Sequence, residues 1–261
     1  SGFDILGGGQ NLIPYQDDIL LNLVTCALVI FGGIGFLVIR EVIAKRFRWK
    51  KLSMHAKVVL FMSLVLTAAG TVLLKLTEDI TWMGAFFTSV SARTAGFSTF
   101  PLGSFSGAGL LTVIVLMVIG ASPGSTGGGI KTTTCYVLFE GIRSSATNTS
   151  EKAFRYAVPT DAFRKAAVIT LLAIGIVLSG TYILVILEPG VPFLDALFEM
   201  SSAFGTAGLS TGISAGLCDA AKILTILIMF IGRLGPLTIA SLWYFTKGER
   251  VSYPEGNIAI G

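Results

Sequence analysis

Two short segments of the chain carry the same three residues in the same order, and their chemistry suits a dehydrated cation. Residues 94–97 read Thr-Ala-Gly-Phe and residues 206–209 read Thr-Ala-Gly-Leu. In an extended turn, backbone carbonyls can replace the hydration shell of a cation. Glycine suits such a turn because it adopts backbone angles that other residues avoid and lets an ion approach the main chain. The two segments are therefore candidates for the lining of a cation path.

Both segments belong to a longer internal repeat, which argues against an ordinary helix-breaking turn. Residues 82–99 align with residues 193–211, with one extra residue before the second Thr-Ala-Gly. A long apolar stretch follows each copy. The number of residues between the motif glycine and a glycine of that stretch is the same in both copies, from Gly96 to Gly120 and from Gly208 to Gly232. Internal repeats determine the architecture of a chain and deserve precedence over local signals.

The first residues of the chain resemble the tail of a third copy. Residues 1–4 read Ser-Gly-Phe-Asp, and the apolar stretch that follows them carries glycines at 32, 33 and 35. We therefore expect three turns to converge on one axis. The expected ion-binding residues are Ser1, Gly2, Phe3, Thr94, Ala95, Gly96, Phe97, Gly205, Thr206, Ala207, Gly208 and Leu209.

The composition is typical of a protein that crosses a lipid bilayer with helices. Of 261 residues, 53% are hydrophobic and 13% are charged, with a mean hydropathy of +0.80. A typical soluble domain has about 25% charged residues. A spanning helix needs about 20 apolar residues, and isolated strands cannot satisfy their backbone groups in lipid. The expected spanning helices cover residues 17–39, 56–75, 108–140, 166–187 and 220–246.

Two amphipathic segments precede the Thr-Ala-Gly turns and are too short to span a bilayer. They cover residues 80–92 and 192–204, and such segments are expected to enter the membrane and return. Non-helical backbone at that depth is tolerated only inside the protein or along water. The negative C-terminal end of each short helix would point at the ion. Each unit is therefore a helix, a re-entrant pore helix, a filter loop and a second helix.

The expected span 108–140 is interrupted by a glycine-rich stretch. Proline and several glycines cannot maintain a regular helix, and the freed backbone groups need water or protein partners. We expect a flexible loop below the Thr-Ala-Gly turns, with a static kink as the alternative; the family resemblance described below implies that this loop acts as a gate. The expected gate residues are Gly120, Ser122, Pro123, Gly124, Ser125, Thr126, Gly127, Gly128, Gly129, Lys131 and Arg233.

Lys131 and Arg233 are assigned to the gate by their positions. Lys131 follows the glycine-rich stretch, and Arg233 follows the glycine that aligns with Gly120. Intramembrane arginines are costly and usually face the bundle interior or a water-filled cavity. We expect both side chains to hold loop carbonyls, and Arg233 also to repel a descending cation. A snorkelling or purely structural arginine is the alternative.

The sequence contains no recognisable catalytic arrangement. A phosphate-binding loop requires adjacent Gly-Lys-Ser/Thr after a strand, whereas Ile130 separates Gly129 from Lys131 here, after an apolar stretch. The expected spans hold no carboxylate pair, and the three cysteines suggest neither a disulfide framework nor a zinc site. We expect neither nucleotide hydrolysis nor another enzymatic activity, and no covalently bound cofactor.

The distribution of charge orients the chain in a membrane. Most Lys and Arg residues lie in segments 40–57, 131–165 and 247–250, which face the cytoplasm by the positive-inside rule, as does the C-terminus. On the opposite side acidic residues outnumber basic ones, and such a surface attracts cations. Arg93 and Glu199 are expected among these outer charges. The net charge of +4 thus reflects the inner loops and not nucleic-acid binding.

Several stretches resemble the Trk/Ktr/HKT superfamily of potassium transporters. Residues 91–99 (SARTAGFST) resemble its third filter segment, residues 202–212 (SAFGTAGLSTG) its fourth, and residues 232–236 (GRLGP) the signature of its last pore helix. Residues 253–261 (YPEGNIAIG) are similar to the C-terminus of the membrane-embedded component of bacterial Ktr systems. The chain opens inside a motif, so we expect an N-terminal truncation.

The resemblance implies an all-α polytopic membrane protein whose repeats surround a central pore. Residues 1–51 would be the end of repeat two, residues 52–150 repeat three and residues 151–261 repeat four. The implied function is potassium uptake across a bacterial cell membrane, with potassium bound at the filter residues. Sodium conduction, or symport coupled to sodium or protons, stays open because the first filter bears on ion preference and is not in the chain.

The resemblance also implies partners. It predicts a homodimer embedded in the lipid bilayer, with a cytoplasmic nucleotide-binding regulatory ring of the kind that Ktr systems contain. Potassium is the only cofactor expected. The basic segment 141–165 is a candidate docking surface for such a partner, and a solvated basic loop is the alternative.

Overall fold

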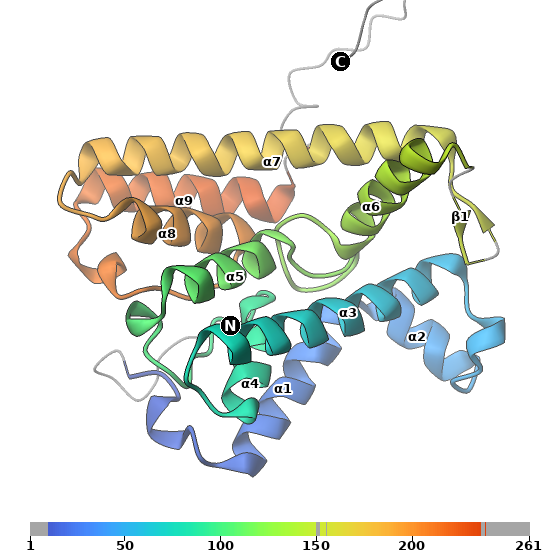
Figure 1. Ribbon diagram of the computed structural model, residues 1–261, viewed down its shortest axis with the longest axis horizontal. Coiled ribbons are helices and arrows are strands. Elements are labelled where there is room, and N and C mark those ends of the chain that lie inside the picture. The colour runs from blue at the N-terminus through green and yellow to red at the C-terminus, as the bar shows by residue number, and fades with distance from the viewer. Residues whose placement is uncertain (1–9, 150–151, 155, 236–237, 239–261) are drawn as a thin grey trace, which may run out of the picture.

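A computed structural model describes residues 10–149, 152–154, 156–235 and 238, and the chain folds there into helices with one short hairpin (Figure 1). The all-α class is therefore confirmed. The helices are α1 (Ile19–Ile34), α2 (Phe36–Ala44), α3 (Met54–Thr77), α4 (Trp82–Ala92), α5 (Gly107–Val118), α6 (Thr132–Thr147), α7 (Thr160–Leu187), α8 (Phe193–Gly205) and α9 (Asp219–Leu234). The strands are β1 (Lys152–Ala153) and β2 (Tyr156–Ala157).

The helix starts are set by polar side chains in the sequence. Asp18, Ser53, Thr81 and Ser106 precede α1, α3, α4 and α5, and each accepts a hydrogen bond from the N–H three residues ahead. These bonds satisfy donors that a first helical turn leaves free. Loss of such a cap typically costs about 1 kcal/mol. Local sequence therefore determines where these four helices begin.

Two of the described helices are long and apolar enough to cross a membrane without a break. They are α3 and the part of α7 from Asp161 onward. Their outward faces expose large hydrophobic side chains, including Leu64, Leu171 and Tyr182. Exposed apolar surface of this extent is typical of contact with lipid. The expected spans 56–75 and 166–187 are confirmed.

The expected span 17–39 is wrong as a single helix. The chain bends by 96° between α1 and α2, at Gly35, where φ is 91°. A side chain at this position would approach the Pro123 carbonyl to 2.6 Å, and the N–H of Phe36 donates to the Gly124 carbonyl at 3.2 Å. The bend therefore arises from packing against the glycine-rich loop, which the sequence of this stretch alone does not reveal.

The expected span 108–140 is divided as the glycine-rich stretch predicts. Helix α5 ends at Val118, helix α6 begins at Thr132, and Ile119 pairs with Ile130 across the gap. The last expected span, 220–246, is described as helix α9 up to Leu234. Its continuation beyond residue 235 lies outside the described residues, apart from residue 238.

The two short helices are the most enclosed parts of the fold. Helix α4 packs against α1, α3 and α5, and helix α8 packs against α5, α7 and α9. In α8, every residue from Phe198 to Gly205 is buried. In Figure 1, α7 and α9 run side by side with α8 beneath them, while α1, α3 and α4 form a second group. Long helices thus surround short ones, as expected for re-entrant segments.

Candidate functional site

The two Thr-Ala-Gly turns have the same unusual backbone. The angle φ is 76° at Thr94 and 83° at Gly96, and it is 52° at Thr206 and 89° at Gly208. A non-glycine residue in this region is uncommon and costs of order 1–3 kcal/mol. Two threonines adopt it at equivalent positions, so the conformation is a designed feature of the repeat.

Each turn is held by the end of its own short helix. In repeat three, the N–H of Ala95 donates to the Ser91 carbonyl at 3.0 Å, and the Ser91 hydroxyl donates to the Phe97 carbonyl. In repeat four, the N–H of Ala207 donates to the Ser202 carbonyl at 2.9 Å, and the N–H of Gly208 donates to the Ser202 hydroxyl at 3.2 Å. A serine of the short helix, Ser91 or Ser202, therefore stabilises each turn through hydrogen bonds. The sequence analysis did not assign this role.

The two turns lie against one another. A side-chain carbon built on Gly208 would be 3.6 Å from the Cα of Gly96. Both glycines line one cavity of about 450 Å³. Its lining consists of backbone, hydroxyl, amide and apolar groups from Asn11, Ile13 and the segments 96–104 and 208–215, without a titratable side chain. Neutral oxygens are the ligands that suit a dehydrated alkali cation. Ser1, Gly2 and Phe3 lie outside the described residues.

Asn11 is a functional candidate that the sequence analysis missed. Its side-chain amide donates to the Gly96 carbonyl at 3.1 Å, and the N–H of Leu12 donates to the Ser98 carbonyl at 3.0 Å. The segment before α1 is therefore hydrogen-bonded to the turn at residues 94–97. The only signal for this role in the sequence was that Asn11 lies shortly after residues 1–4, the partial copy of the motif.

Two charges expected on the outer surface are in fact buried. Arg93 has 8% of its surface exposed and Glu199 has 4%. Arg93 donates to groups of α3, and Glu199 accepts from the hydroxyls of Ser210 and, at 2.8 Å, Ser214. Neither side chain therefore contributes to an exposed surface, because the longer helices enclose α4 and α8.

The glycine-rich loop lies directly beneath both turns. A carbon built on Gly127 would be 2.2 Å from the Thr94 hydroxyl, and one built on Gly128 would be 2.7 Å from the Thr206 hydroxyl. The N–H of Gly128 donates to that Thr206 hydroxyl at 2.9 Å. Such close approach of backbone to the threonines requires residues without side chains.

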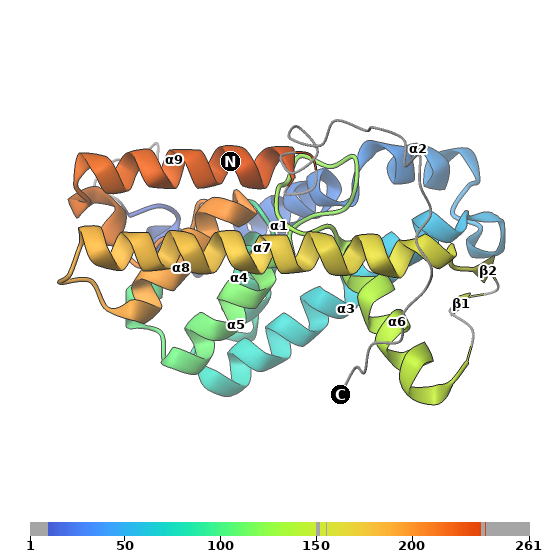
Figure 2. The same cartoon turned by 90° about the horizontal axis from the view of Figure 1, so that it is seen from above.

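Free carbonyls at two helix ends hold the loop in place. The last carbonyls of a helix lack partners within it. In α1, the Gly33 carbonyl accepts from Ser122 at 3.0 Å and the Gly32 carbonyl accepts from Thr126 at 3.3 Å. In α9, the Gly232 carbonyl accepts from Gly129 at 3.3 Å. The loop therefore bridges the ends of α1 and α9, where Figure 2 shows it in the middle of the molecule.

Two basic side chains grip the carbonyls of the same loop. Lys131 donates to the Gly127 carbonyl at 2.7 Å, and Arg233 donates to the Thr126 carbonyl. The expected contacts of Lys131 and Arg233 with loop carbonyls are thus present. No carboxylate pairs with either of them in the described part of the chain. Two positive charges therefore lie below the turns, along with a loop that fills the space beneath them.

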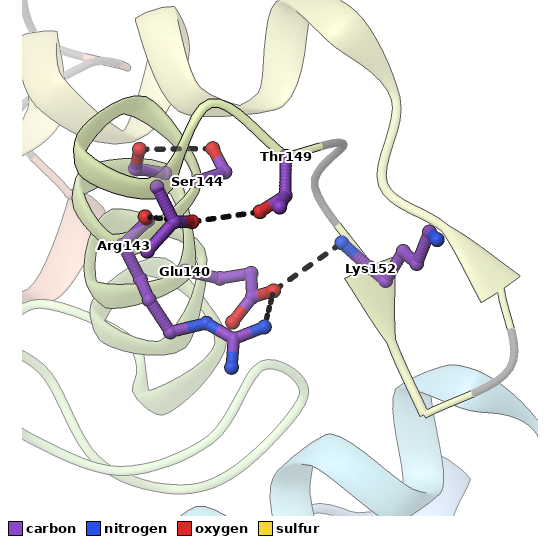
Figure 3. A network of polar contacts seen from close by, with 7 residues as sticks. Glu140, Arg143, Ser144, Thr149 and Lys152 are labelled. Atoms are coloured by element: carbon purple, nitrogen blue, oxygen red, sulfur yellow. Dashed lines mark hydrogen bonds and ion pairs between the residues drawn. The ribbon is translucent and has the colours of Figure 1, made fainter.

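The segment 141–165, expected to be a loop, is partly folded. Helix α6 continues to Thr147, and the hairpin follows it. The buried Glu140 carboxylate accepts from Arg143 at 2.8 Å and from the N–H of Lys152 at 3.4 Å, as Figure 3 shows. This contact fastens β1 to α6. Neither element has a long apolar repeat, which is why the sequence did not predict them.

Comparisons with known proteins are consistent with this arrangement. The family profile described as TrkH, cation transport protein, matches residues 1–246. The chain is 36% identical to Ktr system potassium uptake protein B of Bacillus subtilis (strain 168), over 97% of the chain and 59% of that relative. It is 32% identical to the potassium/sodium uptake protein NtpJ of Enterococcus hirae, over 100% of the chain and 61% of that relative.

A solved structure shares the fold. The crystal structure of the potassium transporter TrkH from Vibrio parahaemolyticus matches 85% of this chain and 52% of its own, with a TM-score of 0.70 and 20% identity. The chain spans about three fifths of the length of the curated relatives that it matches.

Proposed function

The chain belongs to the TrkH family of cation transport proteins, and we propose that it forms part of a potassium-conducting pore in a cell membrane. The observation that carries the proposal is the approach of Gly96 and Gly208 across one cavity whose lining offers backbone, hydroxyl and amide groups and no titratable side chain. In the proposed pore the two Thr-Ala-Gly turns supply carbonyls that replace the hydration shell of potassium. We call the turn at residues 94–97 filter three and the turn at residues 206–209 filter four.

The glycine-rich loop is the proposed gate. It fills the space beneath both filter turns and is held by hydrogen bonds to helix ends, a filter hydroxyl and two basic side chains. Each neutral bond contributes about 1 kcal/mol, so a modest rearrangement of neighbouring helices would release the loop. Lys131 and Arg233 would then keep a positive charge near the opened path.

The proposed working protein is larger than this chain and has partners. We propose that it functions as a homodimer in the bilayer and that a cytoplasmic nucleotide-binding ring regulates it, with the C-terminus on the cytoplasmic side. The name of the Bacillus relative describes a component of a system, which supports the search for further components. The folded segment formed by α6 and the hairpin offers a shaped surface for such a partner.

The test is cation uptake by the protein expressed from its complete gene in cells that lack potassium uptake. Restored growth at low external potassium, with uptake of potassium well above that of sodium, is the expected result. Both ions are measured because one relative is named for both. Equal uptake of sodium, or no uptake with normal membrane insertion, would overturn potassium conduction.

A further inference from the structure

Arg93 occupies the junction between a pore helix and its filter turn. It caps the C-terminal end of α4 and directly precedes Thr94. Its side chain is buried, and its three hydrogen bonds all go to α3. In the described part of the chain no carboxylate forms an ion pair with it. A buried arginine without such a partner is costly, so its retention calls for a function.

The guanidinium uses its forked geometry. Its Nη1 donates to the Ser63 carbonyl at 3.1 Å and to the Thr67 hydroxyl at 3.3 Å, and its Nη2 donates to the Ser63 hydroxyl at 3.3 Å. One turn earlier, the Ser89 hydroxyl donates to the Thr67 carbonyl at 3.0 Å. Two positions four residues apart on α4 are thus fastened to two positions four residues apart on α3. This double tie holds the end of α4 at a defined height.

Among the described residues, repeat four has no such tie. The residue directly before the motif threonine is Arg93 in one copy and Gly205 in the other, and any side chain at Gly205 would come within 2.3 Å of the Met117 carbonyl. No charged side chain can occupy that place. Helix α8 is instead linked through Glu199 to its own outer segment at Ser214. Of the two turns that the structure describes, only the one at residues 94–97 is therefore directly preceded by a buried positive charge.

We propose that Arg93 is a positioning and specificity-determining residue of filter three. This proposal rests on the proposed potassium conduction. Its fork sets the position of Thr94 and the following carbonyls, and its charge weakens the hold of the filter on a cation. The charge acts because the C-terminal end of a helix carries a partial negative charge that favours cations, and Arg93 neutralises that end of α4.

The two contributions are separated by Arg93→Lys, which keeps the charge and loses the fork, and Arg93→Gln, which loses both. Thr67→Val removes one acceptor of the fork. Thr71→Val is its matched control, because the Thr71 hydroxyl donates only within α3, to the Thr67 carbonyl at 2.7 Å. All variants are made in the protein expressed from its complete gene and compared at equal membrane abundance.

The fork is tested by the ratio of potassium to sodium uptake. Arg93→Lys and Arg93→Gln are expected to lower this ratio about tenfold. Thr67→Val is expected to lower it about twofold to threefold, and Thr71→Val not at all. The scale is set by one neutral hydrogen bond, whose loss changes an equilibrium constant by about fivefold. An unchanged ratio in Arg93→Lys, or an equal loss in Thr71→Val, would overturn the positioning role.

The charge is tested by the half-saturating potassium concentration, expected about threefold lower in Arg93→Gln than in Arg93→Lys. Equal values would overturn the charge effect.

Amide hydrogen exchange provides a readout that does not need transport. In purified Arg93→Lys protein, exchange of residues 94–99 is expected to rise, while exchange of residues 206–211 stays at the wild-type level. No rise, or an equal rise in both segments, would overturn the positioning role. A localised rise in a protein whose wild-type form carries no potassium would instead overturn the proposed function and leave the positioning role in place.

Discussion

Repeats three and four present the same filter turn but fasten it to different parts of the molecule. Filter three is tied to the middle of α3 through Arg93 and to the segment before α1 through Asn11. Filter four is tied to the glycine-rich loop through Thr206 and to its own outer segment through Glu199. The internal repeat therefore specifies the turn, while the anchoring of the turn differs between copies.

Because of this difference, the two filters have different roles in the proposed pore. Filter three packs against the loop at Gly127 but has no hydrogen bond to it among the described residues, so a movement of the loop reaches this filter through packing alone. Filter four shares a hydrogen bond with that loop, so a movement of the gate reaches it directly. We expect variants of the two filters to differ in gating more than in ion preference.

The largest expected effect comes from the filter glycines. Gly96→Ser and Gly208→Ser place a side chain at φ values of 83° and 89°, which costs about 1–2 kcal/mol. Both variants should lower the preference for potassium over sodium about tenfold. The new carbon at position 208 would contact the Cα of Gly96 at 3.6 Å, so that variant tests both turns at once. Uptake of both ions in potassium-transport-deficient cells measures this, and a well-expressed Gly208→Ser protein with wild-type preference contradicts it.

Shortening the loop is the next strongest test. Deletion of residues 122–128 removes its bonds to α1 and to Thr206, and its ends are close because Gly120 lies against Gly128 and Gly129. Basal flux should rise roughly tenfold or more, because the closed state loses the loop's hydrogen bonds to α1 and Thr206 and those from Lys131 and Arg233, each of about 1 kcal/mol or more. Liposome flux with and without the proposed cytoplasmic ring is the measurement. A lower flux in a normally folded protein would favour a structural kink.

Arg233 offers a smaller effect of the same sign. At about 8 Å and an effective dielectric of about 20, the Arg233 guanidinium and a cation in the pore repel by about 2 kcal/mol. Arg233 also donates a hydrogen bond to the Thr126 carbonyl of the loop. Arg233→Ala should conduct about fivefold faster, because Lys131 still grips the loop, while Arg233→Lys should stay near wild type. Single-turnover or steady-state flux at matched abundance decides the matter. If Arg233→Ala inserts normally and conducts no faster, the residue is structural.

The smallest effect addresses the comparison of the two repeats directly. Thr206→Val removes the acceptor for the Gly128 N–H, whereas Thr94 has no hydrogen bond to the loop among the described residues. Basal flux should rise about twofold to threefold in Thr206→Val, consistent with the loss of one neutral hydrogen bond, and should not rise in Thr94→Val. Equal behaviour of the two variants would show that the loop does not distinguish the filters.

Features that depend on local chemistry followed from the sequence by itself. The apolar runs of α3 and α7, the two short helices and the break between α5 and α6 were all expected in nearly their observed places. Hydrophobic length, polar caps and the glycine-rich composition act over a few residues, and lipid leaves the backbone few alternatives to a helix. The repeat also predicted that Gly96 and Gly208 would meet.

Only the tertiary structure decided which partners those local elements find. The bend at Gly35, the burial of Arg93 and Glu199, and the contact of Asn11 with Gly96 each depend on a segment distant in the chain. The loop is held by carbonyls at the ends of α1 and α9, which are free because every helix leaves its last carbonyls without partners. A one-dimensional pattern shows that such groups exist, whereas their pairing is set by the three-dimensional packing of the helices.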